Sequence, residues 1–422
     1  MSESIVITGV GVVSPIGCTR DSICSNLRAN LSAIRPRNFE CGTQFLFANV
    51  ADDFEAVSAG AMDRLSQLEQ EVATVDNGLL FGLTAARTAM RESGLDFASV
   101  DPTRVGVVVS ASKGQFRTLI YSIEMHERLG DKATPAEQRK MAEMYLSYPG
   151  NTASRVISKQ FQFCGPMLNY PSACATGIFS TIQAAELLRT GVVDVALAGS
   201  SESTGNVMVL AGFQNMGALS ASQPRPFHAK RDGFAAGEGA AVLVLERESD
   251  ARARGARIIA RIAGSDVRGD AYHLTGVDTR GESVEYAIRM TLKKAGWAPA
   301  DVQYINAHGT GTQLNDATEA EVISRIFGQP GPLVSSLKSR IGHLLGGSAS
   351  VEIALTLVAL DDGFVPSTHG LDEPDPSFRV SFVPEDGAEA DLQRFMKFSL
   401  GFGGHIGVIA FERVDGFARE HP

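Results

Sequence analysis

Short runs of valine, isoleucine and alanine alternate along the chain with longer stretches whose apolar residues recur at helical spacing. The runs predict strands buried on both faces, because they lack the strict alternation of a half-exposed sheet. The predicted strands are Ser4–Val10, Arg104–Ser110, Val193–Gly199, Ala240–Glu246, Ile258–Ser265, Val302–Asn306, Leu333–Ser336, Val380–Val383 and Ile406–Glu412. The predicted helices are Leu79–Glu92, Ala175–Arg189, Gly281–Ala295, Thr318–Phe327 and Ser348–Leu360. Strands that alternate with helices in this way indicate an α/β fold with helices on both faces of the sheet.

The order of predicted elements in the first part of the chain is roughly repeated in the second part. A buried strand opens the chain, and a similar strand at Ile258–Ser265 follows a charged stretch near its middle. Each half later contains a serine-bearing turn that leads into a helix, at 172–177 and at 335–347. We therefore predict two similar halves, residues 1–256 and 257–422, with a helical insertion near 113–160 in the first.

The composition of the chain excludes several classes of function. Lys+Arg 38 against Asp+Glu 48 give a net charge of −10, and no basic stripe is present to meet the phosphates of a nucleic acid. The chain has no run of about 18 apolar residues and no basic leader before an apolar segment, so we expect neither a membrane span nor a signal peptide. We expect a cytoplasmic protein.

Five cysteines are scattered along the chain. Neither a CxxC motif nor a Cys/His ligand spacing links them, which argues against a disulfide framework and against a metal site. We expect four of them to be small buried or surface residues. The four are Cys18, Cys24, Cys41 and Cys164.

The fifth cysteine, Cys174, lies where a predicted strand turns into a helix. Unpaired N–H groups and the positive end of the helix dipole favour a thiolate at such a position. The small neighbours Ala173, Ala175 and Gly177 leave room for a substrate carbonyl to approach. Cys174 is therefore the candidate nucleophile.

Two histidines occupy matching positions in the second half. His308 directly follows a predicted strand, and His343 precedes the helix that carries Glu352. Glycines beside each of them leave the imidazole open to a ligand. A thiolate with two imidazoles suits acyl transfer followed by stabilisation of charge on a carbonyl oxygen.

A glycine-rich segment, Ser399–Gly404, forms a hinge between a predicted strand end and Ile406–Glu412. It is either a plain turn or a place where backbone and the Phe402 ring approach a substrate. Gly9-Val-Gly11 lacks the third glycine and the helix start of a dinucleotide site, so we expect no nucleotide cofactor.

Six segments in this order resemble the β-ketoacyl-acyl carrier protein synthases, the elongating condensing enzymes of the thiolase superfamily. They are Val6–Gly17, Ser172-Ala-Cys-Ala-Thr-Gly177, Pro226–Phe234, Asn306-Ala-His-Gly-Thr-Gly-Thr312, Lys338–His343 and Gly401-Phe-Gly-Gly404. The resemblance spans nearly the whole chain. It implies the thiolase fold, with two αβαβα-layered halves, and a dimer.

The resemblance also implies roles for single residues. Cys174 accepts an acyl chain as a thioester, and His308 and His343 assist decarboxylation of a malonyl-carrier extender. Lys338 and Glu352 match the supporting charge pair of the family. The backbone N–H groups of Cys174 and Phe402 match its oxyanion hole, and the Phe402 ring matches its gate. Thr310, Thr312, Gly401 and Gly403 match positions that bind the phosphopantetheine arm.

The implied partner is an acyl carrier protein, whose own phosphopantetheine arm takes the place of a cofactor. The chain departs from the family at Ile341, at His405-Ile406 and at Gly347–Ala349, which alters the pocket wall. It also lacks the basic cluster that the family commonly places in Ala61–Glu71, where only Arg64 is cationic. Carrier docking then falls to other cations or to a partner subunit, which favours a heterodimer with a homologous chain-length factor as an alternative to a homodimer. The other candidate cations are Arg117, Arg128, Arg225 and Arg268.

Two alternative functions remain at this stage. One is a non-catalytic subunit that shapes the cavity of a partner, although such subunits usually lose the nucleophile. The other is a thiolytic or ketosynthase–cyclase enzyme on the same fold. Thiolysis is disfavoured because no second cysteine follows Cys174.

Overall fold

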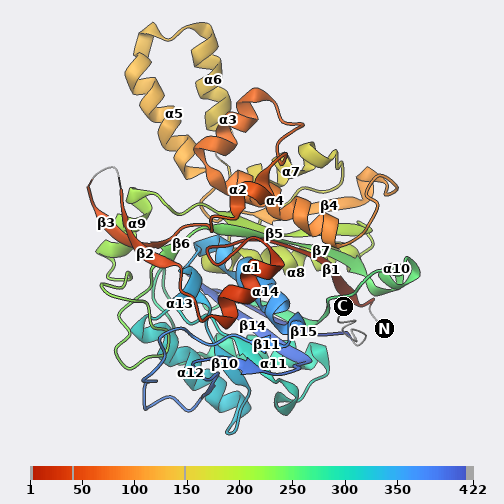
Figure 1. Cartoon of the computed structure of the whole chain (residues 1–422), viewed down its shortest axis with the longest axis vertical. Helices are drawn as coiled ribbons and strands as arrows, with labels where there is room; N and C mark the ends of the chain where they lie inside the picture. Colours follow the sequence, from red (N-terminus) through yellow and green to blue (C-terminus); the bar gives the residue numbers. More distant parts are fainter. Residues whose placement is uncertain (1–2, 40–41, 147–148, 415–422) are drawn as a thin grey trace.

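A single mixed sheet of ten strands runs through the molecule in the computed structural model, which describes residues 3–39, 42–146 and 149–414 (Figure 1). Cys41 lies outside these residues. In spatial order the strands are β12 (Ser381–Phe382), β10 (Leu333–Ser335), β9 (Tyr304–Asn306), β14 (Arg394–Gly401), β15 (His405–Glu412), β8 (Ala260–Gly269), β1 (Ile5–Val13), β7 (Gly239–Arg247), β5 (Val195–Glu202) and β4 (Val105–Ser110).

The two halves of the sheet repeat one topology. Five chain segments of each half correspond, and we number them one to five in the order of the sequence. In the first half, β4-β5-β7-β1 are segments two, four, five and one, and they lie side by side in that order. In the second half, β9-β14-β15-β8 are the same segments in the same spatial order. Beside β4, Met167 forms a parallel bridge to Val107, at the place that β10 takes beside β9. The halves join where β1 and β8 pair antiparallel, with Val6 opposite Arg261. The predicted pair of similar α/β halves is confirmed.

All five predicted helices are present. They are α4 (Asn77–Glu92), α8 (Thr176–Arg189), α11 (Glu282–Ala295), α12 (Gln313–Phe327) and α14 (Ser348–Asp361). Every residue of α14 from Ser348 to Leu360 is buried, as expected of a helix that is apolar on all sides and lies inside the protein.

Helices α8 and α14 pack against each other at their N-termini. A Cβ on Gly177 would lie 2.4 Å from Ser350 Oγ, so the close approach requires glycine there. Ser350 Oγ also accepts a hydrogen bond from Ser200 Oγ of β5 at 2.8 Å. This contact brings together the two turns that precede these helices, one carrying Cys174 and the other His343.

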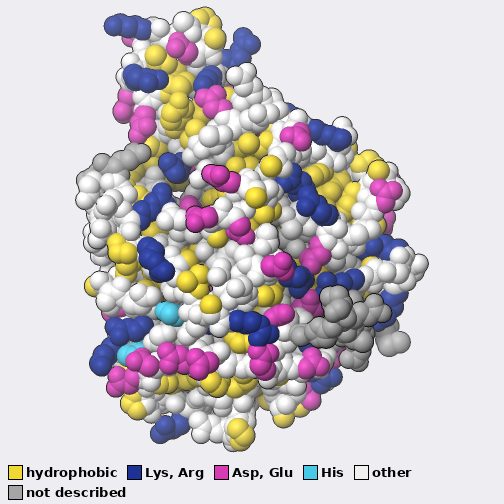
Figure 2. All heavy atoms as spheres, viewed as in Figure 1, with side chains coloured by type: hydrophobic (Ala, Val, Ile, Leu, Met, Phe, Trp, Pro, Cys, Tyr) yellow, Lys and Arg dark blue, Asp and Glu magenta, His cyan; other side chains and the backbone are white. Residues whose placement is uncertain are grey.

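The insertion is helical, as predicted, but only part of it projects from the body. Helices α5 (Phe116–Leu129) and α6 (Pro135–Leu146) form a hairpin that stands away from the sheet (Figure 1). Helix α7 (Thr152–Phe161) returns to the body and buries Val156 and Ile157 in the core. Exposed apolar side chains, Ile123, Tyr145 and Leu146, lie on the hairpin, where Figure 2 shows hydrophobic atoms at the surface.

Several short elements have no counterpart in the predicted pattern. The helices are α1 (Arg20–Arg28), α2 (Phe54–Ser58), α3 (Gln67–Val75), α9 (Val207–Asn215), α10 (Glu248–Ala253) and α13 (Lys338–Ile341). The strands are β2 (Ile34–Asn38), β3 (Gln44–Ala48), β6 (Ala236–Gly237), β11 (Phe364–Val365) and β13 (Ala388–Glu389). Strand β14 continues to Gly401, through the first half of the predicted hinge, although the charged Lys397 interrupts its apolar run. None of the described helices is long and apolar enough to cross a membrane.

Candidate active site

Cys174 lies in a tight 3₁₀ turn, Ala173–Ala175, that leads directly into α8. Ala173 has φ 48, in the left-handed region that costs energy for a residue with a Cβ. The turn is held from the second half of the chain, because Ser399 Oγ donates to the Cys174 carbonyl at 2.9 Å. A Cβ on Gly401 would lie 2.7 Å from the carbonyl of Ser172, so β14 approaches this turn closely only through a glycine.

The Cys174 thiol is protonated at neutral pH. Burial raises its pKa to about 11, while Lys338, Lys113 and a hydrogen bond from the Phe402 backbone N–H act in the opposite direction. The position at a helix start, which by itself favours a thiolate, is therefore outweighed by desolvation. Any attack by this sulfur on a substrate therefore requires loss of the thiol proton.

His343 is buried and its ring is held by the helix start that follows it. The Leu345 backbone N–H donates to Nδ1 at 3.2 Å, and Ser348 Oγ lies 2.7 Å from the same nitrogen. Because Nδ1 accepts a backbone hydrogen bond, the proton of the neutral ring is on Nε2. Burial lowers the pKa of His343 well below its ordinary value, and Lys338 and Lys397 lower it further.

His308 is held by two buried carboxylates of α12. Glu319 accepts hydrogen bonds from the backbone N–H groups of His308 (2.6 Å) and Gly309 (2.8 Å). Asp316 accepts from those of Thr310 (3.0 Å) and Gly311 (3.1 Å). These two side chains fix the loop that carries the histidine. Neither residue was predicted from the sequence, although acidic residues three positions apart on a helix that follows a glycine-rich loop are a signal for them.

A buried charge cluster lies behind the two imidazoles. Lys338 Nζ lies 2.7 Å from Glu352 Oε1, donates to the His308 carbonyl at 2.6 Å and lies 3.4 Å from His308 Nδ1. Burial lowers the pKa of His308 well below its ordinary value, and Lys338 is the next cause. A cation beside Nδ1 favours the neutral ring with its proton on Nε2. A second lysine, Lys397, also contacts Glu352 and was not predicted from the sequence.

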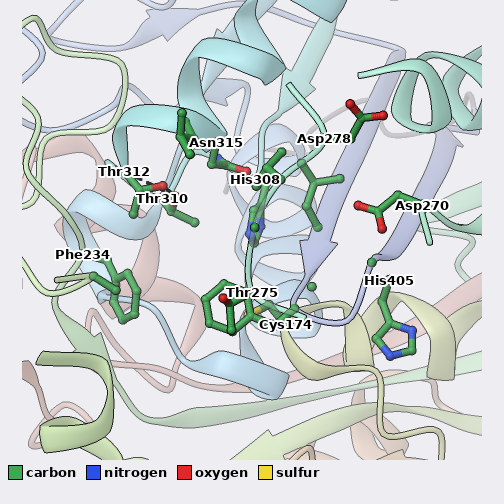
Figure 3. Close-up of a pocket in the computed structure, with 18 of the residues that line it drawn as sticks. Cys174, Phe234, Asp270, Thr275, Asp278, His308, Thr310, Thr312, Asn315 and His405 are labelled. Atoms are coloured by element: carbon green, nitrogen blue, oxygen red, sulfur yellow. Dashed lines mark hydrogen bonds between the residues drawn. The ribbon is translucent and has the colours of Figure 1, made fainter. Parts of the chain in front are cut away.

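One cavity of about 340 Å³ reaches these groups (Figure 3). Cys174, His308 and His343 all line it, and the two imidazole centroids lie 5.7 Å apart with their planes at 82°. Figure 3 shows the His308 ring directed toward Cys174, with Thr310 and Thr312 on one side of the cavity and His405 on the other. The structure thus brings together a thiol and two neutral imidazoles that come from three separate loops.

The other predicted residues are divided between the cavity and its supports. Thr310, Thr312, Gly401 and Phe402 line the cavity, and the two threonine hydroxyls lie 2.8 Å apart. Gly403 is not among the lining residues, and its backbone N–H donates to the Leu274 carbonyl at 2.8 Å. The Phe402 ring is 37% exposed at the mouth, which suits a side chain that moves.

Four of the cysteines have their thiols free in the part of the chain that the structure describes. They are Cys18, Cys24, Cys164 and Cys174. Within residues 3–39, 42–146 and 149–414, no group of three or more His, Cys, Asp or Glu side chains is arranged to hold a metal ion.

The cavity thus holds a thiol at a helix start together with two neutral imidazoles, a combination typical of acyl-transfer enzymes. Family models describe residues 2–251 as "Beta-ketoacyl synthase, N-terminal domain" and residues 259–372 as "Beta-ketoacyl synthase, C-terminal domain". The chain belongs to the β-ketoacyl synthase family, and it is a condensing enzyme of the acyltransferase type.

Individual relatives match over nearly the full chain. A 3-oxoacyl-[acyl-carrier-protein] synthase 2 of Coxiella burnetii is 33% identical over 421 residues, which cover 97% of this chain and 98% of the relative. A putative polyketide beta-ketoacyl synthase 1 of Streptomyces halstedii is 32% identical and covers 96% of each chain.

Solved structures give the same picture. The ishigamide ketosynthase/chain length factor superposes with a TM-score of 0.88 at 28% identity, covering 98% of this chain and all of the other. A ketosynthase in complex with its type II acyl-carrier protein and bound to a hexaketide superposes with a TM-score of 0.84 at 28% identity and the same coverage. The thiolase fold is confirmed.

Proposed function

We propose that Cys174, His308 and His343 carry out a decarboxylative Claisen condensation that extends a carrier-bound fatty acid, polyketide or polyene chain by two carbons. The observation that carries this assignment is the pair of neutral imidazoles, each with Nδ1 engaged by the protein and Nε2–H left for the cavity. Two such N–H donors beside a cysteine suit a site that holds an acyl thioester on the sulfur and stabilises an enolate next to it.

The first half-reaction loads the acyl chain. The Cys174 sulfur attacks the carbonyl of an acyl thioester, the bond to the carrier sulfur breaks, and the thiol proton of Cys174 ends on the released carrier thiol. The backbone N–H groups of Cys174 and Phe402 stabilise the oxyanion that forms. Rotation of the exposed Phe402 ring opens the path to the sulfur.

The second half-reaction uses the imidazoles. The malonyl carboxylate leaves as carbon dioxide, and its bonding electrons form an enolate whose oxygen accepts hydrogen bonds from His308 and His343. The enolate carbon attacks the acyl-Cys174 carbonyl, which gives the β-ketoacyl product and the Cys174 thiolate. A proton from solvent then restores the thiol. Lys338 favours the neutral rings throughout, and Glu352 compensates the charge of its ammonium.

The arm of the carrier protein occupies the cavity above Cys174. Thr310 and Thr312, whose hydroxyls line it, hydrogen-bond the amides of the phosphopantetheine arm, and Gly401 allows close contact. Gly403 supports the hinge instead, since its N–H is already bonded to Leu274. The enzyme needs no metal or organic cofactor of its own, and it works in the cytoplasm, where the carrier and malonyl thioesters are supplied.

The partners we propose are an acyl carrier protein and a second thiolase-like chain. The apolar face of the α5–α6 hairpin and the scarcity of cations near Arg64 support a dimer, either of two copies or with a homologous chain-length factor. Arg268 is already paired with Asp266 at 2.8 Å, which leaves Arg117, Arg128 and Arg225 as the stronger candidates for carrier docking.

Intact-mass spectrometry tests the assignment. The protein is incubated with a set of acyl carrier proteins of different chain length, alongside Cys174→Ala and the matched variant Cys18→Ala. We expect an acyl adduct on the wild type and on Cys18→Ala, and none on Cys174→Ala. No adduct from any donor on the wild type would instead support the chain-length subunit, and normal turnover in Cys174→Ala would refute the nucleophile.

A further inference from the structure

Lys397 is a fully buried lysine on β14, five residues before Phe402. Its ammonium donates to the Asn306 side-chain oxygen at 2.8 Å and to the Ala307 carbonyl at 2.9 Å. It also lies 2.6 Å from Glu352 Oε2. A charged group without solvent is retained at such a place only when its partners compensate for the lost hydration, as these three oxygens do.

Glu352 is shared by two lysines, one on each carboxylate oxygen. Lys338 Nζ lies 2.7 Å from Oε1, and Lys397 Nζ lies 2.6 Å from Oε2. One carboxylate between two ammonium groups leaves one positive charge in excess. This charge lies beside the catalytic loop, because Lys338 binds the His308 carbonyl and Lys397 binds the carbonyl of the residue before it.

We propose that Lys397 is a positioning residue for condensation, which ties the His308 turn to the strand leading to Phe402 and, together with Lys338, supplies the positive charge that keeps both imidazoles neutral. The inference deepens the proposed function and rests on it. Neither the apolar pattern of a buried strand nor the supporting pair Lys338–Glu352 explains why a second lysine is buried at this position.

The electrostatics of the surrounding groups agree with this role. The pKa values of His308 and His343 are lowered by burial first, then by Lys338, with Lys397 contributing to both. The other titratable groups that face this cluster are Glu319 of α12, Glu352 of α14 and Tyr304 of β9. Burial also lowers the pKa of Lys397, to about 8, while Glu352 acts in the opposite direction, so the ammonium is the major form at pH 7.

Two substitutions separate the charge from the hydrogen bonds. Lys397→Met removes both, whereas Lys397→Gln removes the charge but keeps an amide N–H that can donate to Asn306 or Ala307. Lys294→Met is the matched control, because the Lys294 ammonium also binds a backbone carbonyl (Ser265, 2.8 Å) and a buried carboxylate (Asp266, 2.8 Å) but lies on α11. Acyl loading, decarboxylation and overall condensation are measured for each variant from pH 5 to pH 9.

We expect both Lys397 variants to load Cys174 but to decarboxylate more slowly, with the acidic limb of the pH–rate profile displaced upward by about 1 unit. The displacement follows because imidazoles that lose a neighbouring cation take up a proton at higher pH. Lys294→Met should keep the wild-type profile. An unchanged acidic limb in Lys397→Gln would overturn the role of the charge, whether or not Lys397→Met folds.

Chemical rescue gives an independent readout. Lys397→Ala leaves three oxygens around a small cavity, and we expect ammonium chloride to restore part of its decarboxylation, unlike tetramethylammonium chloride at equal ionic strength. Equal effects of both salts would contradict the inference. Failure of the wild type to load any acyl group would refute the proposed function, whereas loading and condensation that do not depend on Lys397 would refute this inference alone.

Discussion

Ser348 Oγ lies 2.7 Å from Nδ1 of His343, at the start of the helix that runs through the centre of the molecule. The same nitrogen accepts the backbone N–H of Leu345. Both contacts leave the Nε2–H of His343 for the cavity. The first turn of α14 thus fixes the tautomer of the His343 ring as well as its position.

Replacing Ser348 by alanine should slow decarboxylation while acyl loading of Cys174 stays near the wild-type rate. The loss of one hydrogen bond to the ring corresponds to about 1 kcal/mol, or about a five-fold lower rate. Carbon dioxide release from malonyl carrier and intact-mass loading measure the two steps. Ser350→Ala is the control, since Ser350 lies on the same helix and bonds to Ser200 instead. An equal decrease of both steps in Ser348→Ala would contradict the assignment.

His343→Ala should have a larger effect on the same step. In the proposed mechanism the imidazole is one of two donors to the enolate oxygen, and such donors are typically worth about 10²–10³ in rate. Transfer of the acyl group to Cys174 should fall much less, because the backbone N–H groups of Cys174 and Phe402 remain. Single-turnover measurements of loading and decarboxylation check this. If both steps fall to the same extent, the division of roles is wrong.

Alkylation of Cys174 should be slow at neutral pH and rise steeply in base. Burial raises the thiol pKa to about 11, so the thiolate fraction grows about ten-fold per pH unit between about pH 7 and about pH 10. Iodoacetamide labelling followed by peptide mass spectrometry measures this rate site by site. Cys174→Ser identifies the labelled peptide. A plateau reached below pH 8 would show that the resting enzyme already holds a thiolate.

Glu319→Gln should destabilise the protein and disturb the His308 loop. Both carboxyl oxygens accept backbone N–H groups, and an amide places its NH₂ against one of these N–H groups, at a cost of about 1–3 kcal/mol. Chemical unfolding measures the loss, with Glu321→Gln, an exposed position on the same helix, as the control.

The pH dependence of this loss has a definite sign. The pKa of Glu319 is raised by burial from 4.5 to about 7, so the folded state holds a proton that the unfolded state releases. This contribution to stability is present below about pH 4.5 and is lost as the pH rises through about 7. The deficit of Glu319→Gln relative to the wild type should therefore be larger at pH 5 than at pH 8. A deficit that grows with pH would contradict the buried, protonated carboxyl.

Much of the fold could be predicted from the periodicity of apolar residues. The buried runs at β1, β5 and β7 and the helical spacing in α4 and α11 are dictated by burial on one or both faces, which is a local signal. Strand β14 was recognised only by its end, because its charged Lys397 contradicts the pattern of a buried strand. The charge of that lysine is compensated by oxygen atoms from β9 and α14, which lie far away in the sequence.

The residues of the candidate site also differ in whether the sequence predicts them. Cys174, His308, His343 and Lys338 stand in distinctive local motifs, so the sequence identified them. Glu319 and Asp316 act through hydrogen bonds to the His308 loop, and only their spacing on α12 marks them in the sequence. Ser348 acts through its contact with His343, and no local motif marks it. The thiolate expected from the helix start illustrates the limit, since the pKa of Cys174 is decided by how completely the packed structure removes water.

The sequence by itself determined the α/β class, the two similar halves and the candidate residues for acyl transfer, because these depend on periodicity and on short motifs. Only the tertiary structure decided which nitrogen of each imidazole carries the proton, that the thiol is protonated and that a second lysine shares Glu352. Those properties arise from burial and from charges and hydrogen-bond partners that folding brings together from distant segments. Local sequence patterns therefore cannot predict them.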